Sequence, residues 1–133
     1  MNKTITRTAT IFMDENEILH IIPHKDIHMD YEDALDNYLV VRTLSKNKPV
    51  LKLVDSGFYW SIDKKAKDFI NSKEIREKTI ARALVLNSFV DQAIFNFFKR
   101  LNKPKVPTQV FTNKDDAYNW LLIMKIRHND ENR

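Results

Sequence analysis

The chain has 133 residues, 43% of them hydrophobic and 30% charged, which fits one globular domain with its own core over residues 1–133. It contains no cysteine, so disulfides, thiol catalysis and cysteine-ligated metal centres are excluded. The formal net charge is +4, but 22 basic residues are mixed with 18 acidic ones along the same segments. This charge does not predict a nucleic-acid partner.

The hydropathy of the chain and its N-terminal sequence indicate its cellular location. No apolar run approaches the roughly 20 residues that a membrane span needs. The stretch MNKTITRTATIFMDENE has no apolar core followed by a small-residue cleavage site, as a secretory signal would have. We therefore expect a cytoplasmic protein without membrane insertion.

The N-terminal third predicts a β-hairpin followed by a helix. ITRTATIFM (5–13) and ILHII (18–22) are rich in β-branched residues, and the acidic turn DENE separates them. Asp30 is a candidate N-cap for a helix over residues 31–44. Asp33 falls in the first turn of that helix, where the helix dipole favours a negative charge.

The remaining segments alternate between strand and helix patterns. Alternation of this kind predicts a largely parallel sheet with right-handed crossovers, which the hairpin opens in antiparallel fashion. The expected order is β-β-α-β-α-β-α-β-α. We expect strands at 49–55, 80–88 and 108–112, helices at 63–70, 90–101 and from Asn113 onward, a short turn capped by Ser72, and a frayed tail over 126–133.

Five stretches, in this order, carry a resemblance to a known family: ILHIIP, YEDA, KPVLKLVD, SIDKKAKDF and IFNFFKRLNKPKVPTQVFTNKDDAYNWL. The resemblance covers about Ile11 to Leu122, and the last stretch is the most specific. They resemble the STAS domain, also described as the SpoIIAA-like fold, and more closely a family of small, uncharacterised bacterial proteins with that fold. The resemblance implies an α/β fold with a mixed sheet of about five strands. It also implies a non-enzymatic module for protein–protein regulation, sometimes switched by phosphorylation or ligand binding.

The resemblance also implies where a regulatory phosphoacceptor would lie. In regulatory STAS proteins that serine stands at the start of the second main helix, just after an aspartate. Asp63 matches the aspartate, but Lys64 and Lys65 stand where the serine-containing pair would be. Ser56 and Ser61 lie nearby, outside the matched position. We therefore predict no phosphoacceptor at that position.

The loop after the central strand is the candidate interaction surface. It follows the carboxyl end of a strand, where α/β proteins bind ligands, and it carries three successive aromatic residues. Exposed aromatics would suit a partner. Alternatively, Phe58 and Trp60 tuck under the sheet edge, while the polar residues close a turn at Gly57 and cap the next helix. The candidate surface comprises Asp55, Ser56, Phe58, Tyr59, Trp60, Ser61 and Asp63.

Other patterns point away from catalysis and metal binding. His20, His24 and His28 recur every four residues, which on one helix would align imidazoles for a metal, but they fall on a strand and beyond Pro23. The chain has one glycine, which excludes a glycine-rich phosphate loop, and it has no nucleophile elbow. We expect no catalytic residue, cofactor or metal.

Two alternatives concern the partner. The basic residues Lys99, Arg100, Lys103 and Lys105 complement a helix dipole, or else contact phosphate or anionic lipid. The surplus of aromatic residues suggests a small apolar ligand or lipid as the second candidate function, which needs a cavity of roughly 300 Å3. We expect a protein partner and no nucleic acid, and leave homo-oligomerisation open.

Overall fold

The structure is a computed structural model that describes residues 2–86 and 106–132. The strands are β1 (Thr4–Ile5), β2 (Ala9–Met13), β3 (Ile18–Pro23), β4 (His28–Met29), β5 (Val50–Ser56), β6 (Ser61–Ile62), β7 (Thr79–Leu86) and β8 (Thr108–Phe111). The helices are α1 (Tyr31–Leu44), α2 (Lys64–Ile70), α3 (Lys73–Glu77) and α5 (Lys114–Glu131). The helix expected at 90–101 and the basic residues 99–105 lie outside the described residues.

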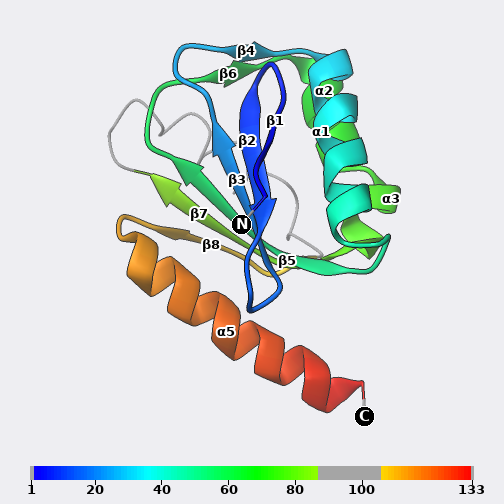
Figure 1. Ribbon diagram of the computed structural model, residues 1–133, viewed down its shortest axis with the longest axis vertical. Coiled ribbons are helices and arrows are strands. Elements are labelled where there is room, and N and C mark those ends of the chain that lie inside the picture. Colours follow the sequence, from blue (N-terminus) through cyan, green and yellow to red (C-terminus); the bar gives the residue numbers. More distant parts are fainter. Residues whose placement is uncertain (1, 87–105, 133) are drawn as a thin grey trace.

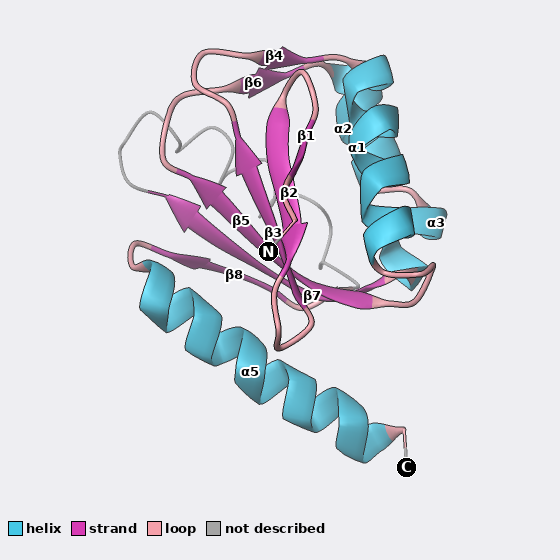
Figure 2. Cartoon of the chain, viewed as in Figure 1, coloured by secondary structure: helices cyan, strands magenta, loops and turns pink. Residues whose placement is uncertain are grey.

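Among the described residues, six strands form one sheet in the order β1-β2-β3-β5-β7-β8. The first three pair in antiparallel fashion, and β3, β5, β7 and β8 run parallel (Figure 2). Helices α1, α2 and α3 cover one face of this sheet, and α5 covers the other (Figure 1). The mixed sheet opened by an antiparallel hairpin is confirmed.

The strand count is higher than the expected five because the segment 5–13 turns back on itself. The Thr6 hydroxyl accepts the backbone N–H of Thr8 at 3.3 Å and that of Ala9 at 3.1 Å, and these bonds close a turn. The segment therefore gives β1 and β2 in place of one strand. The short β4 and β6, which pair with each other in parallel, were not expected either.

The central strand β5 divides its side chains between the two faces. Leu51 and Leu53 are buried against Ala117 and Leu121 of α5. Lys52 and the next alternate residues point to the opposite face, under α1, α2 and α3. The short apolar run therefore belongs to a strand that is covered on both faces.

Helices α1, α2 and α5 begin at side-chain caps that the sequence predicts, whereas Ser72 precedes α3 without a side-chain hydrogen bond to the first turn of that helix. Asp30 accepts the N–H of Asp33 at 2.9 Å, and Asp33 accepts the N–H of Asp30 at 3.0 Å, which forms a complete capping box. Asn113 caps α5 by accepting the N–H groups of two aspartates in its first turn. The tail expected to fray over 126–133 is instead helical to Glu131, where the Asn132 side chain donates to the His128 carbonyl at 2.7 Å.

Arg7 fastens the turn between β1 and β2 to the start of α1. Its Nε donates to Asp33 Oδ1 at 2.8 Å, a second nitrogen contacts Asp33 Oδ2, and the same nitrogen donates to the His28 carbonyl at 2.7 Å. The Asp33 side chain is 7% exposed. The hydrogen bond from Arg7 lowers the pKa of Asp33 to about 2.

This pair predicts a defined loss of stability in acid. Because the folded pKa of Asp33 lies below its unfolded value of about 3.9, its contribution is fully present at neutral pH and is lost as pH falls from about 4 through about 2. Asp33→Asn should cost about 1 kcal/mol at pH 7 and flatten this part of the profile. Urea unfolding at a series of pH values measures both effects.

The matched control is Asp36→Asn, which alters an exposed carboxylate on the same helix. Its unfolding free energy should follow that of the unmodified protein throughout. Equal slopes for the protein and for Asp33→Asn between pH 4 and pH 2 would contradict this role of Asp33.

Candidate functional site

Trp60 holds the loop between β5 and β6 in place from beneath. Its ring is 5% exposed, and its Nε1 donates to the hydroxyl of Ser56 at 3.1 Å. Ser56 itself is fully buried. Both residues were expected as parts of an interaction surface, and the structure corrects this, since neither presents its side chain to solvent.

Phe58 and Tyr59 point outward, with 57% and 49% of their surface exposed. The expectation that Phe58 tucks under the sheet edge is therefore wrong. Lys25 lies over the Phe58 ring with its Nζ 5.8 Å from the centroid, and the Tyr59 carbonyl accepts the N–H of Asp26 at 2.8 Å. We call Lys25, Phe58 and Tyr59 the aromatic surface.

The other candidate residues have structural partners. Asp63 caps α2 by accepting the N–H of Ala66 at 2.8 Å. Ser61 bonds to His28 Nδ1 at 2.7 Å, between the paired strands β4 and β6. Asp55 lies on the opposite face of the sheet, 3.7 Å from the ammonium of Lys114. The structure therefore does not bring these polar residues together into one cluster.

Gly57 lies within this loop, and Lys64 and Lys65 begin the helix that follows it. Gly57 was expected to supply a permissive backbone. No glycine in the described residues has a positive φ, so the turn does not use the conformational freedom of Gly57. Lys64 is exposed and pairs with Asp68 at 2.9 Å. Lys65 lies over the Tyr31 ring, with its Nζ 4.8 Å from the centroid. Both lysines belong to the outer side of the first turn of α2.

The three regularly spaced histidines have separate partners. His20 bonds to Asp14, His24 bonds to Thr10 at 3.0 Å, and His28 bonds to Ser61. In the part of the chain that the structure describes, no group of three potential ligands is placed to hold a metal ion.

A polar cluster that the sequence did not suggest joins the hairpin to α5. Tyr118 donates its hydroxyl to Asp14 Oδ2 at 2.7 Å, and His20 Nε2 lies 2.9 Å from the same oxygen. Burial raises the pKa of Asp14, but the hydrogen bonds with His20 and Tyr118 and those from the backbone N–H groups of Ile18 and Asn16 together outweigh it and leave the pKa lowered. His20 Nδ1 is buried and has no hydrogen-bond partner among the residues that the structure describes. Since neither ring nitrogen of His20 is open to a substrate, the cluster fastens α5 to the sheet.

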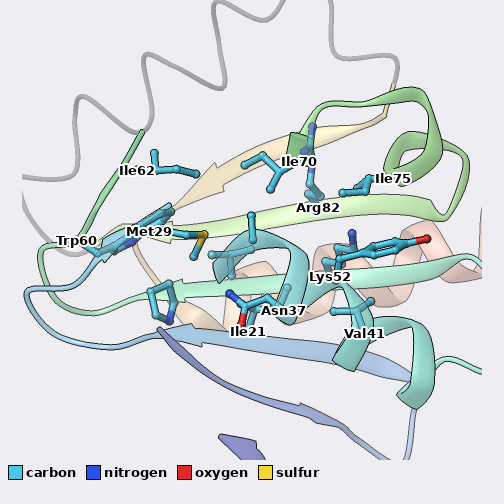
Figure 3. A pocket seen from close by; sticks show the side chains of 14 residues that line it. Ile21, Met29, Asn37, Val41, Lys52, Trp60, Ile62, Ile70, Ile75 and Arg82 are labelled. Atoms are coloured by element: carbon cyan, nitrogen blue, oxygen red, sulfur yellow. The ribbon is translucent and has the colours of Figure 1, made fainter. Parts of the chain in front are cut away.

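A pocket between the sheet and α1, α2 and α3 was also missed (Figure 3). Its cavity volume is about 110 Å3, and its walls are mostly apolar. Lys52 and Arg82, which are paired in register on β5 and β7, both line it. We call this site the basic pocket. A charged residue in the middle of each apolar run, VLKLV and IARALVL, is the signal in the sequence that could have found it.

Burial changes the acidity of both cations. Together with the charge of Arg82, it lowers the pKa of Lys52 to about 7. Burial also lowers the pKa of Arg82 to about 10, and the Arg82 Nε donates to Thr108 at 3.3 Å. The apolar surroundings therefore disfavour the charge on both side chains.

A drug-sized apolar ligand or lipid needs more room than the basic pocket provides. Its 110 Å3 is well below the roughly 300 Å3 at which ligand pockets begin. Two larger hollows, of about 250 and 280 Å3, are more open surface grooves. None of the described helices combines the length and apolar character that crossing a bilayer requires.

The antiparallel hairpin, the parallel strands β3-β5-β7-β8 and helices on both faces define a SpoIIAA-like α/β fold. The crystal structure of an uncharacterised protein from the DUF3478 family with a SpoIIAA-like fold, from Shewanella loihica PV-4, matches with a TM-score of 0.58. The match covers 85% of this chain and 91% of that chain. At 15% sequence identity, this likeness shows the fold alone.

Residues 11–125 match the family described as "Domain of unknown function (DUF7793)". The match covers most of the chain, and the chain belongs to this family. No curated protein matches it. The resemblance to SpoIIAA-like proteins is thus confirmed for the fold.

The bond between Trp60 and Ser56 predicts coupled effects on stability. Ser56→Ala leaves the buried indole N–H without its acceptor and should cost about 1 to 2 kcal/mol. Trp60→Phe removes the donor and leaves a cavity, and should cost about 2 to 3 kcal/mol. The double variant should lose about 1 kcal/mol less than the sum of the two. Urea unfolding followed by circular dichroism measures all three values.

Ser61→Ala is the control, because it removes a hydroxyl whose bond to His28 is exposed. It should change the unfolding free energy by less than about 0.5 kcal/mol. Strict additivity of the Ser56 and Trp60 substitutions would show that their hydrogen bond does not hold the loop.

Proposed function

We propose that this protein is a non-enzymatic, cytoplasmic interaction module of STAS-like type that binds a protein partner through the aromatic surface. The observation that carries the proposal is the outward display of Phe58 and Tyr59 beside the buried Trp60. A sequence of three aromatics that served only the core would bury all three. Here one fastens the loop and two remain available for contact.

The loop is held firmly enough to make such contacts efficient. Backbone hydrogen bonds run from the Asp26 N–H to the Tyr59 carbonyl at 2.8 Å and from the Ser61 N–H to the Ile27 carbonyl at 3.0 Å, so Asp26 and Ile27 support the loop at two points. A surface that is ordered before binding loses little conformational entropy when it binds. Tyrosine and phenylalanine also supply large contact areas with few rotatable bonds.

The charge next to the rings indicates the chemistry of the partner. Lys25 stands over Phe58, and α2 begins with two further lysines nearby in sequence. Positive charge around an apolar centre favours a partner whose own apolar residues are surrounded by carboxylates. Such charges act mainly on the association rate and on specificity.

The test is quantitative co-purification from the native cell with mass spectrometry, followed by titration of the recovered partner. Phe58→Ala/Tyr59→Ala should reduce its recovery and raise its Kd by a factor of about 30 or more, because two exposed aromatic contacts are lost. Both side chains are exposed, so circular dichroism and the unfolding midpoint should stay unchanged.

The matched control is Ile123→Ala/Ile126→Ala, which removes a pair of exposed apolar side chains from α5. Its binding should equal that of the unmodified protein. Retained binding by the Phe58/Tyr59 variant, or equal loss in both variants, would refute the proposal. If the partner is a second copy of this chain, the same two variants should differ in molar mass by light scattering.

A further inference from the structure

We propose that the basic pocket binds a small organic monoanion, a carboxylate with a short apolar tail, whose charged end lies against Lys52 and whose tail lies between the sheet and the helices (Figure 3). This inference is independent of the aromatic surface. It rests on the charge, the free polar groups and the size of the pocket.

The charge of the pocket is one-sided. Lys52 and Arg82 lie on neighbouring strands with their side chains on the same face, and no Asp or Glu is among the described residues that line the site. A small adjoining hollow that shares Lys52 with the pocket adds Arg42 and Lys78, again without an acidic residue among the described residues that line it. An anion is the ligand that complements this arrangement.

The neutral side chains Asn37 and Tyr38 of the pocket are engaged in hydrogen bonds with other residues. Asn37 donates to Thr8 at 3.0 Å, and its carbonyl oxygen accepts from Thr6 at 2.6 Å. Tyr38 donates its hydroxyl to Glu74 at 2.7 Å. The Tyr38 hydroxyl has no hydrogen left to donate, and Asn37 keeps one amide hydrogen, so neither supplies the charge that would hold an ionised head group.

Lys52 differs from these groups because it is a cation whose ammonium group has no partner among the described residues. Across residues 2–86 and 106–132 it makes no hydrogen bond and no ion pair, while Arg82 is engaged with Thr108. An ammonium group placed among apolar side chains without an acceptor is costly, and a bound carboxylate would supply both acceptors and countercharge. A partly buried lysine without a partner in a pocket is therefore the strongest indication of a ligand.

The dimensions set the class of ligand. A cavity of 150 Å3 in an apolar protein core holds benzene, so the 110 Å3 of this pocket suits a molecule of about five to seven non-hydrogen atoms. Ile21, Val54, Ile70 and Ile75 offer apolar contacts to a short tail. Inorganic anions would leave these contacts unused, and long-chain fatty acids would not fit.

Trp60 lines the same pocket and provides the readout. In the full chain carrying Trp120→Phe it is the remaining tryptophan, since the sequence has two. Pentanoate should change its fluorescence saturably with a Kd in the millimolar range or below, as expected for so small a ligand. Pentanol, inorganic phosphate and octanoate should each bind at least about tenfold more weakly, because each lacks the charge, the tail or the fit.

Lys52→Met should raise the Kd for pentanoate by at least about tenfold while the protein stays folded, since it replaces a desolvated cation with an apolar chain of similar length. Ile75→Phe fills the pocket and keeps Lys52, and it should abolish binding of pentanoate. It is the second test variant if Lys52→Met does not fold. Lys65→Met, an exposed lysine outside the pocket, is the control and should bind normally.

The pH dependence gives an independent readout. The affinity for pentanoate should fall by about tenfold between pH 6 and pH 8, because Lys52 of the unliganded protein, whose pKa is about 7, loses its proton in this range. The other titratable groups facing it, Arg82, Tyr38, Arg42 and Lys78, are arginine, lysine or tyrosine side chains. Equal binding of pentanol, unchanged binding by Lys52→Met, or no saturable response to pentanoate would overturn the proposal.

Discussion

The alternation of side chains along β5 is the constraint on which the rest of the structure depends. Because successive residues point to opposite faces, Leu51 and Leu53 must pack against α5 while Lys52, Val54 and Ser56 face α1, α2 and α3. A slip of one residue in register would turn Lys52 toward α5 and would turn the two leucines toward α1, α2 and α3. The core, the basic pocket and the acceptor for Trp60 are therefore set by one strand.

The sequence predicted the elements wherever the local signals and the global fold agree. The capping residues Asp30, Asp63 and Asn113 each start a helix as expected, because their side chains satisfy backbone N–H groups close by in the chain. The prediction from the sequence was wrong at Thr6, where one hydroxyl accepts two backbone N–H groups and divides an apparently continuous strand into two. The pattern of β-branched residues there is the same for one strand or two.

The candidate site shows a different limit. Sequence position placed Asp55, Ser56 and Trp60 in one loop region, but strand alternation sends Asp55 to the far face and packing buries the other two. The basic pocket depends on Lys52 and Arg82, which lie 30 positions apart in the chain and become neighbours only through the pairing of β5 with β7. A motif search in one dimension does not see this kind of pair, although each residue is conspicuous in its own apolar strand.

Trp60 belongs to both sites that the structure presents. One part of the side chain lines the basic pocket, and its N–H fixes the loop that displays Phe58 and Tyr59 through the hydroxyl of Ser56. Since Ser56 follows Lys52 on the same face of the same strand, the pocket and the loop share a rigid floor. The aromatic surface and the pocket are thus two ends of one packed unit. Any rearrangement of the indole ring must alter the pocket wall and the support of the loop together.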